Sequence, residues 1–82
     1  MRFDLVLAGL RLFKSRTQAQ AAITSGAVLL NGRAAKPSDD VRAGDLVRLA
    51  GTRGARTVEV LEMPRRSLSH EAARALVREI EE

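Results

Sequence analysis

The sequence contains no cysteine, tryptophan or tyrosine, and only one histidine, two phenylalanines and two prolines in 82 residues. Without cysteine the chain cannot form a disulfide, a thiolate metal site or a thiol nucleophile. No apolar run approaches the roughly 20 residues that a membrane-spanning helix needs, and Met1 is not followed by a signal-peptide pattern. These absences predict a cytoplasmic protein.

Few residues could carry catalytic chemistry. His70 has no sequence-near partner except Glu71, which is typical of a surface histidine, and the adjacent acids Asp39 and Asp40 follow Pro37 in a stretch typical of a loop. A chain of this length has room for one small domain and not for a deep cleft beside a sufficient core. We therefore expect no enzyme, no catalytic residue, no metal site and no cofactor.

Charge is unevenly distributed along the chain. The whole sequence has a net charge of +4, but residues 1–36 carry six basic side chains against the single acid Asp4. Residues 67–82 carry four acidic side chains against two basic ones. A basic half and an acidic end predict one face that binds a polyanion.

The stretch LFKSRTQA (12–19) concentrates this positive charge at one point. Ser15, followed three residues later by Gln, has the spacing of a capping box at the start of a helix. A helix start is itself positive and favours acids, yet Lys14 and Arg16 flank this cap, with Arg11 on the preceding segment. Asp4, the only acid in this half, cannot neutralise all the nearby cations. The arrangement is best explained by an external phosphate, with Gln20 one turn further along the helix.

The scarcity of aromatic residues restricts the kind of polyanion. Recognition of unstacked bases usually depends on aromatic side chains, and here Phe3 and Phe13 are the only rings apart from His70. The partner is therefore expected to be structured RNA, read through its phosphates, 2′-hydroxyls and shape.

The apolar spacing predicts two N-terminal helices, over residues 3–12 and 16–25. Gly26 is expected just past the second helix. The buried positions are Phe3, Leu7, Leu10, Ala19, Ala22 and Ile23.

After Gly26 the pattern is that of short strands. Asn31-Gly32 indicates a tight turn between two short strands, and residues 46–50 and 55–62 are expected to pair, with Val47 opposite Val58 on the inner side. Gly51 to Gly54 (GTRG) has the spacing of a nucleic-acid-clamping Gly-x-x-Gly loop, but its strand-like flanks favour a hairpin turn. Residues 69–80 have the apolar spacing of a last helix.

This order of elements predicts an α+β fold, with two N-terminal helices packed on a small, mostly antiparallel sheet, plus a C-terminal helix. We expect residues 1–66 to form the RNA-binding domain with a sheet extension, and residues 67–82 to form the C-terminal helix.

Five motifs in this order resemble the S-four RNA-binding domain: R-F-D (2–4), R-L-F-K-S-R-T (11–17), A-x-x-x-I-x-x-G-x-V-x-x-N-G (19–32), K-P-S (36–38) and V-x-x-G-D (41–45). Together they cover about residues 2–49. The chain length and the C-terminal extension are similar to the heat-shock protein fifteen group of stand-alone members. The resemblance implies the alpha-L type of RNA-binding motif, with RNA bound along the helix side.

The resemblance also implies which residues contact RNA and what the protein does. The motif positions are Arg2, Arg11, Lys14, Ser15, Arg16, Gln20, Asn31, Lys36 and Ser38, to which Arg33 is added from the same turn. Asp4 is expected to orient Arg2 or Arg11, and Asn31 is equally explained as a turn residue. The implied partners are the large ribosomal subunit, its rRNA and tRNA, in rescue or quality control of stalled subunits that carry a nascent chain.

Two other functions remain open at this stage. One is an rRNA-linked chaperone of broader specificity. The other is a targeting module that works in trans for an RNA-modifying enzyme such as a pseudouridine synthase. We expect a monomer in each case, and neither the RNA helix that is contacted nor the protein partners follow from the sequence.

Overall fold

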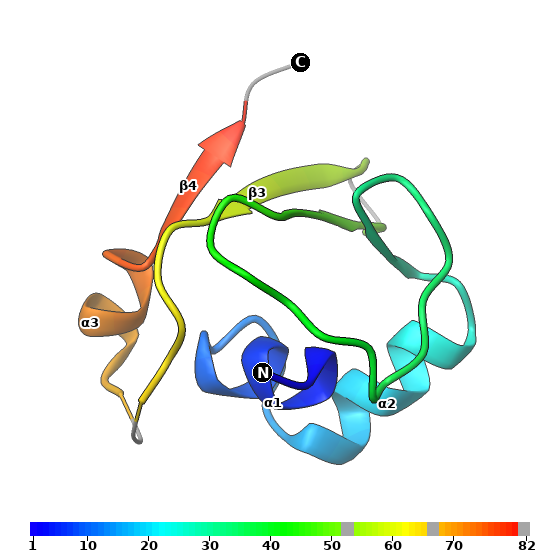
Figure 1. The fold of residues 1–82 in the computed structure, drawn as a ribbon, viewed down its shortest axis with the longest axis horizontal. Helices are drawn as coiled ribbons and strands as arrows, with labels where there is room; N and C mark the ends of the chain where they lie inside the picture. Colours follow the sequence, from blue (N-terminus) through cyan, green and yellow to red (C-terminus); the bar gives the residue numbers. More distant parts are fainter. Residues whose placement is uncertain (52–53, 66–67, 81–82) are drawn as a thin grey trace.

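The computed structural model describes residues 1–51, 54–65 and 68–80. Its helices and strands follow one another in the order α1 (Phe3–Gly9), α2 (Arg16–Thr24), β1 (Val28–Leu30), β2 (Leu46–Leu49), β3 (Arg56–Val60), α3 (His70–Arg74) and β4 (Val77–Ile80). Figure 1 shows this path from the N-terminal helices to the last strand. The predicted α+β class is confirmed.

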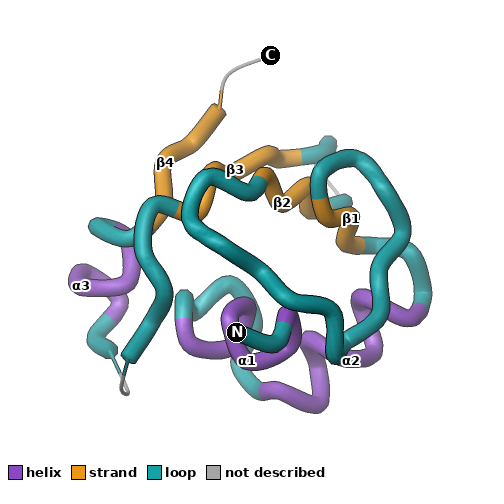
Figure 2. Tube along the Cα trace, in the orientation of Figure 1, coloured by secondary structure: helices purple, strands orange, loops and turns teal. Residues whose placement is uncertain are grey.

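The strands form one antiparallel sheet in the order β1-β2-β3-β4. Helices α1 and α2 lie together on one side of this sheet, and α3 lies beside β4 (Figure 2). Val47 pairs with Val58, and both side chains are fully buried, as the alternation of apolar residues predicts. The side chain of Val47 therefore points from the sheet toward α1 and α2.

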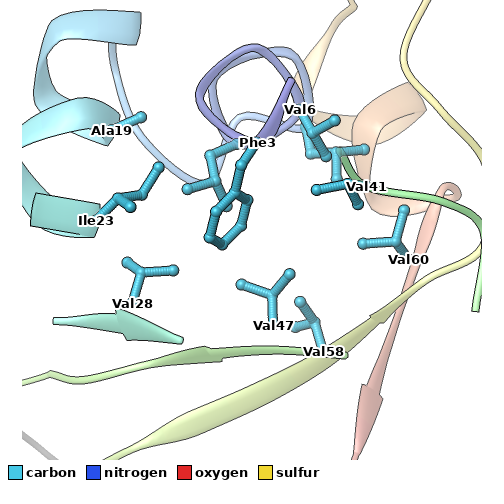
Figure 3. Packing of buried hydrophobic residues seen from close by; sticks show 11 residues of the cluster. Phe3, Val6, Ala19, Ile23, Val28, Val41, Val47, Val58 and Val60 are labelled. Atoms are coloured by element: carbon cyan, nitrogen blue, oxygen red, sulfur yellow. The ribbon is translucent and has the colours of Figure 1, made fainter. Parts of the chain in front are cut away.

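The core fills the space between the helix pair and the sheet (Figure 3). All of the N-terminal residues expected to be buried belong to it or pack against it. The buried cluster consists of Phe3, Val6, Leu7, Leu10, Ala19, Ile23, Val28, Val41, Val47, Val58 and Val60.

Local backbone signals agree with the structure at three points. The Ser15 hydroxyl accepts a hydrogen bond from the backbone N–H of Gln18 at 3.1 Å, which confirms the predicted cap of α2. Gly26 ends the same helix with a φ of 83°. Asn31 and Gly32 both have positive φ, at 53° and 80°, as the predicted turn requires.

The chain after this turn differs from the expectation of a second short strand. Only an isolated bridge joins Leu30 to Arg33, and β1 pairs instead with β2. Residues 52–53 of the expected GTRG turn lie outside the described residues.

The expected helix over residues 69–80 is wrong in its second half. Helix α3 ends at Arg74, and residues 77–80 form β4, whose Val77 lies opposite Val60 on β3. Apolar residues at 76, 77 and 80 fit a helical stripe equally well in sequence, but β3 offers an unpaired edge whose backbone groups these residues satisfy. Tertiary pairing therefore overrides the helical spacing.

Helix α1 is shorter than the expected 3–12 and packs closely on Pro64. A methyl group built on Gly9 would lie 2.6 Å from the Pro64 Cγ and 2.8 Å from its Cβ, which is well inside van der Waals contact. A side chain at this position is therefore excluded unless α1 moves away from residues 63–65.

We predict that Gly9→Ala lowers the free energy of unfolding by about 1–2 kcal/mol. The clash costs about 1–3 kcal/mol, and alanine recovers up to about 1 kcal/mol through its helix propensity. Urea unfolding of Gly9→Ala, Pro64→Gly and the double variant measures the coupling between the two sites. Strictly additive losses would contradict this assignment of the clash.

Candidate nucleic-acid interface

Asp4 is a charged residue that is completely buried, in the first turn of α1. Its Oδ1 accepts hydrogen bonds from Arg2 Nε at 3.1 Å and from the Leu5 backbone N–H at 2.8 Å. Its Oδ2 accepts from Arg2 Nη2 at 3.1 Å, Arg16 Nε at 3.0 Å and Gln20 Nε2 at 2.8 Å. One carboxylate therefore joins the N-terminal segment to two turns of α2. We call Arg2, Asp4, Arg16 and Gln20 the Asp4 cluster.

The electrostatics of the Asp4 cluster keep the carboxylate charged. Burial alone would raise the pKa of Asp4, but the hydrogen bonds from Arg2, Gln20, Arg16 and the Leu5 N–H outweigh it and hold that pKa well below its usual range. The bond to Asp4 in turn raises the pKa of Arg2. At neutral pH the Asp4 cluster is therefore a carboxylate bonded to two guanidinium groups.

These bonds correct the sequence-based explanation of the cations at the start of α2. Asp4 was expected to orient Arg2 or Arg11 and to leave Arg16 for an external anion. The structure shows it bonded to Arg2 and to Arg16, whereas Arg11 lies elsewhere. Part of the positive charge is thus neutralised within the fold.

The two arginines nevertheless remain accessible to solvent. Their side chains are 43% and 47% exposed for Arg2 and Arg16, while the carboxylate between them is covered. Arg16 uses Nε toward Asp4, and its two terminal nitrogens form no hydrogen bond with any residue that the structure describes. Lys14 is exposed and pairs with none of the described acids. The fold therefore holds these guanidinium groups by one edge and leaves the other edge open.

The K-P-S motif lies beside this cluster because it caps α1. The backbone N–H groups of Phe3 and Asp4 donate to the carbonyls of Asp39 and Pro37, at 2.8 and 3.1 Å. The Asp39 carboxylate in turn accepts from the Lys36 N–H at 2.9 Å. This turn brings the exposed Lys36 and Ser38 to the start of α1, next to Arg2.

Asn31 stabilises the turn between β1 and the segment that follows it. Its amide Nδ2 donates to Asp45 at 3.2 Å, and its Oδ1 accepts from the Leu46 N–H at 2.9 Å. These bonds and its positive φ are those of a turn residue. A contact of Asn31 or of the exposed Arg33 with RNA stays a prediction.

Arg11 does not join the Asp4 cluster. Helix α1 ends at Gly9, and Arg11 has a φ of 61°. Its N–H donates to Ala8 and the next N–H, of Leu12, donates to Leu7, which is the hydrogen-bond pattern of a Schellman motif with arginine in the position usually held by glycine. Its side-chain Nε donates to the Leu68 carbonyl at 2.7 Å. The expectation that the first helix extends to residue 12 and includes Arg11 is therefore wrong.

The sequence did not reveal that Asp4 is buried or that Gln20 bonds to it. The usable signal was present, because Asp4 is the one acid among six basic residues in positions 1–36. A buried charge needs partners of the opposite sign. A lone acid among several basic residues has such partners available and is therefore a candidate for a buried, paired position.

Comparison with known proteins places this geometry in a family. The S4 domain model matches residues 1–47. The chain is 39% identical over 64 residues to the RQC P-site tRNA stabilizing factor of Helicobacter pylori strain J99, an alignment that covers 78% of this chain and 76% of the relative. It is 37% identical over 73 residues to the factor of the same name from Bacillus subtilis strain 168, which covers 89% and 85%.

A longer relative and a solved structure agree with this placement. The heat shock protein 15 homolog of Aeromonas salmonicida is 35% identical over 81 residues, which are 99% of this chain and 61% of the relative. The structure of Vibrio cholerae heat shock protein 15, described as trimeric, superposes with a TM-score of 0.91 at 29% identity and covers 98% of this chain and 81% of that one.

None of the helices within the described ranges is long and apolar enough to cross a membrane. The family model spans α1, α2, β1 and the start of β2, and thus contains the whole Asp4 cluster. The chain belongs to the S4 domain family.

Proposed function

We propose that this protein binds structured RNA of the large ribosomal subunit, rRNA together with tRNA, during rescue or quality control of stalled subunits that carry a nascent chain. It does so in the cytoplasm, as a monomer and without catalysis. The observation that carries the proposal is the Asp4 cluster, in which a buried carboxylate fixes two half-exposed arginines on a basic surface.

Preorganised arginines suit the recognition of phosphate. A guanidinium group carries five N–H donors in a rigid fork that matches phosphate oxygens. Because Asp4 already fixes Arg2 and Arg16, less side-chain freedom is lost on binding. Lys14, Lys36 and Ser38 extend the surface that the cluster begins.

The aromatic residues support recognition of backbone and shape. Phe3 is fully buried in the core, and Phe13 is half-buried against it. Phe3 therefore has no face to offer a base, and Phe13 has at most part of one. Stacking of splayed bases is a poor explanation for binding by this chain.

The names of the relatives support the cellular role. Two of them are RQC P-site tRNA stabilizing factors, and the solved structure is a heat shock protein. We carry the tRNA and the quality-control setting over to this chain as part of the proposal. The trimer described for the Vibrio cholerae protein makes the monomeric state a point for direct measurement by analytical ultracentrifugation.

We predict strongly salt-dependent binding to structured RNA. If about four to six phosphates are neutralised, a plot of log K against log salt should have a slope of about −3 to −5, at about 0.7–0.9 per contact. Titration of an rRNA hairpin between low and physiological salt measures this slope. A slope near zero would refute the electrostatic basis of the proposal.

Sedimentation of cell extracts tests the cellular target. The wild-type chain should migrate with free large subunits, and Lys14→Glu should shift it to the top of the gradient, because Lys14 is exposed and forms no ion pair with a described residue. Arg78→Ala is the control for loss of a basic side chain, since Arg78 pairs with Glu59 on the sheet. Migration with a modifying enzyme in place of large subunits would favour the in-trans targeting function.

A further inference from the structure

A small cavity of about 220 Å³ lies at the opposite end of α1 from Asp4. It is formed where the turn after α1, the start of β3, α3 and β4 converge. Figure 1 shows α3 and β4 on the side of the molecule away from α2, so this cavity is separate from the Asp4 cluster. Its lining residues are Leu10, Arg11, Leu12, Arg56, His70, Arg74 and Val77.

Its polar lining is entirely basic. Three arginines and one histidine, from three separate segments, line this space. All four residues are exposed, the other lining residues are apolar, and Leu10 among these is buried. Among the described residues, Glu79 is the acid that pairs with this lining: it accepts from Arg56 Nε and is not itself a lining residue. Arg74 forms no hydrogen bond or ion pair with another described side chain. Like charges gathered beside apolar walls repel one another unless an anion lies between them.

The backbone of Arg11 gives an independent reason to expect a ligand. Both N-terminal helices end in the same hydrogen-bond pattern, with Gly26 in the left-handed position after α2 and Arg11 in that position after α1. An arginine there is unfavourable compared with glycine. The Arg11 Nε donates to the Leu68 carbonyl, which is not part of the cavity lining, and the terminal nitrogens of Arg11 form no hydrogen bond with a described residue.

We propose that this cavity is a binding site for a single phosphate group. Its volume is below the roughly 300–1,000 Å³ of ordinary small-molecule pockets, and its donors are those that match phosphate oxygens. The phosphate belongs either to an RNA backbone or to a small free phosphate compound. The site uses none of the Asp4 cluster residues, although Arg11 is one of the expected RNA contacts. If the phosphate is that of an RNA backbone, the proposal rests on the function proposed above; if it is a free compound, the proposal goes beyond that function.

Inorganic phosphate, titrated into the full chain in a buffer without other polyvalent anions, is the direct probe. Saturable shifts of the backbone amide NMR signals of residues 10–12 and 70–77 are expected. Arg74→Ala and Arg11→Gly should each weaken this binding at least fivefold. Arg78→Ala also removes one arginine, but from a position on β4 outside the cavity lining, and should weaken binding less than twofold. Glu79→Gln should strengthen binding, because it removes the carboxylate next to Arg56.

Three results would overturn the proposal: no saturable shifts at these residues, an equal loss in Arg78→Ala, or no gain in Glu79→Gln. Arg11→Gly removes the strain of an arginine with positive φ. Glu79→Gln keeps all four basic residues of the cavity lining. The test therefore does not depend on a destabilised variant.

Structured RNA, titrated into the same variants, identifies the source of the phosphate. If an RNA backbone supplies it, Arg74→Ala lowers RNA affinity severalfold and makes the salt slope shallower by about 0.7–0.9. If a free phosphate compound supplies it, RNA affinity is unchanged while phosphate binding is lost. Lys14→Glu should abolish RNA binding through the basic surface without changing the phosphate shifts, which separates failure of this site from failure of the proposed function.

Discussion

Replacing Asp4 with asparagine should lower the free energy of unfolding by about 2–4 kcal/mol. The carboxylate accepts five hydrogen bonds, two of them from Arg2, and has no exposed surface. An asparagine amide keeps one oxygen and turns an NH₂ group toward side-chain donors that have no other acceptor among the described residues. Because Arg2 and Arg16 can return partly to water, the loss is smaller than for a fully buried ion pair.

RNA affinity of Asp4→Asn should fall by about tenfold, equivalent to about 1.4 kcal/mol. The direction is informative, because the variant is more positive than the wild type. If Asp4 only opposed RNA electrostatically, its removal would strengthen binding. A loss of affinity in spite of the added charge identifies Asp4 as a positioning residue for Arg2 and Arg16.

Glu62→Gln is the matched control, since Glu62 is exposed and forms no ion pair with a residue in the described ranges. It makes the same change of charge and should alter neither the urea midpoint nor the affinity appreciably. Equal stability of Asp4→Asn and Glu62→Gln would show that the Asp4 bonds contribute nothing to the fold.

The difference in stability between wild type and Asp4→Asn should depend on pH. The folded-state pKa of Asp4 is lowered, so the stability it contributes is fully present above its unfolded value of about 3.9 and is lost as the pH falls through the folded-state pKa. The difference in stability between wild type and Asp4→Asn should therefore be constant near neutral pH and shrink below about pH 4.

Much of the fold follows from local sequence signals. Ser15 with Gln18, Gly26, and the Asn31-Gly32 pair each fix a backbone conformation by their own chemistry. The pairing of Val47 with Val58 follows from the alternation of apolar residues together with a turn expected at Gly51 to Gly54. These features depend on a few neighbouring residues, and so they could be read without a structure.

The errors occurred where distant segments decide the outcome. Residues 77–80 form a strand because β3 presents an open edge, and no pattern within 69–80 contains that information. Arg11 ends α1 in a conformation that favours glycine, so the helix end had no glycine to mark it.

The functional surface shows the same division between local and distant information. The basic residues were identified from composition and motif, but which of them share a partner depends on the angle between α1 and α2. That angle brings Arg16 and Gln20 to Asp4 across 12 and 16 residues of sequence. Local charge counting treated Arg16 as unpaired for this reason.

Arg16→Glu should consequently lower stability and RNA binding together. A carboxylate at the start of α2 would gain about 0.3–1 kcal/mol from the helix dipole if nothing else were near. In this structure it would instead face the buried Asp4 carboxylate, which accepts from Arg16 at 3.0 Å. Losing that bond and adding a like charge should cost about 1–3 kcal/mol net, because the half-exposed position screens part of the repulsion. RNA affinity should fall by tenfold or more, since the phosphate loses a guanidinium group and meets a carboxylate.

Thr17→Glu separates the effect of the helix dipole from the loss of the bond to Asp4. Thr17 is exposed in the same first turn of α2 and forms no hydrogen bond with Asp4. It should leave the melting temperature unchanged or slightly higher, since only the helix dipole acts on it. Arg16→Lys adds a further step, in which the charge is kept but the fixed fork geometry is lost, so stability and affinity should fall less than in Arg16→Glu. If Arg16→Glu melts at or above the wild-type temperature, as Thr17→Glu should, then the bond to Asp4 does not hold Arg16 in solution, and Arg16 is a surface cation kept for RNA alone.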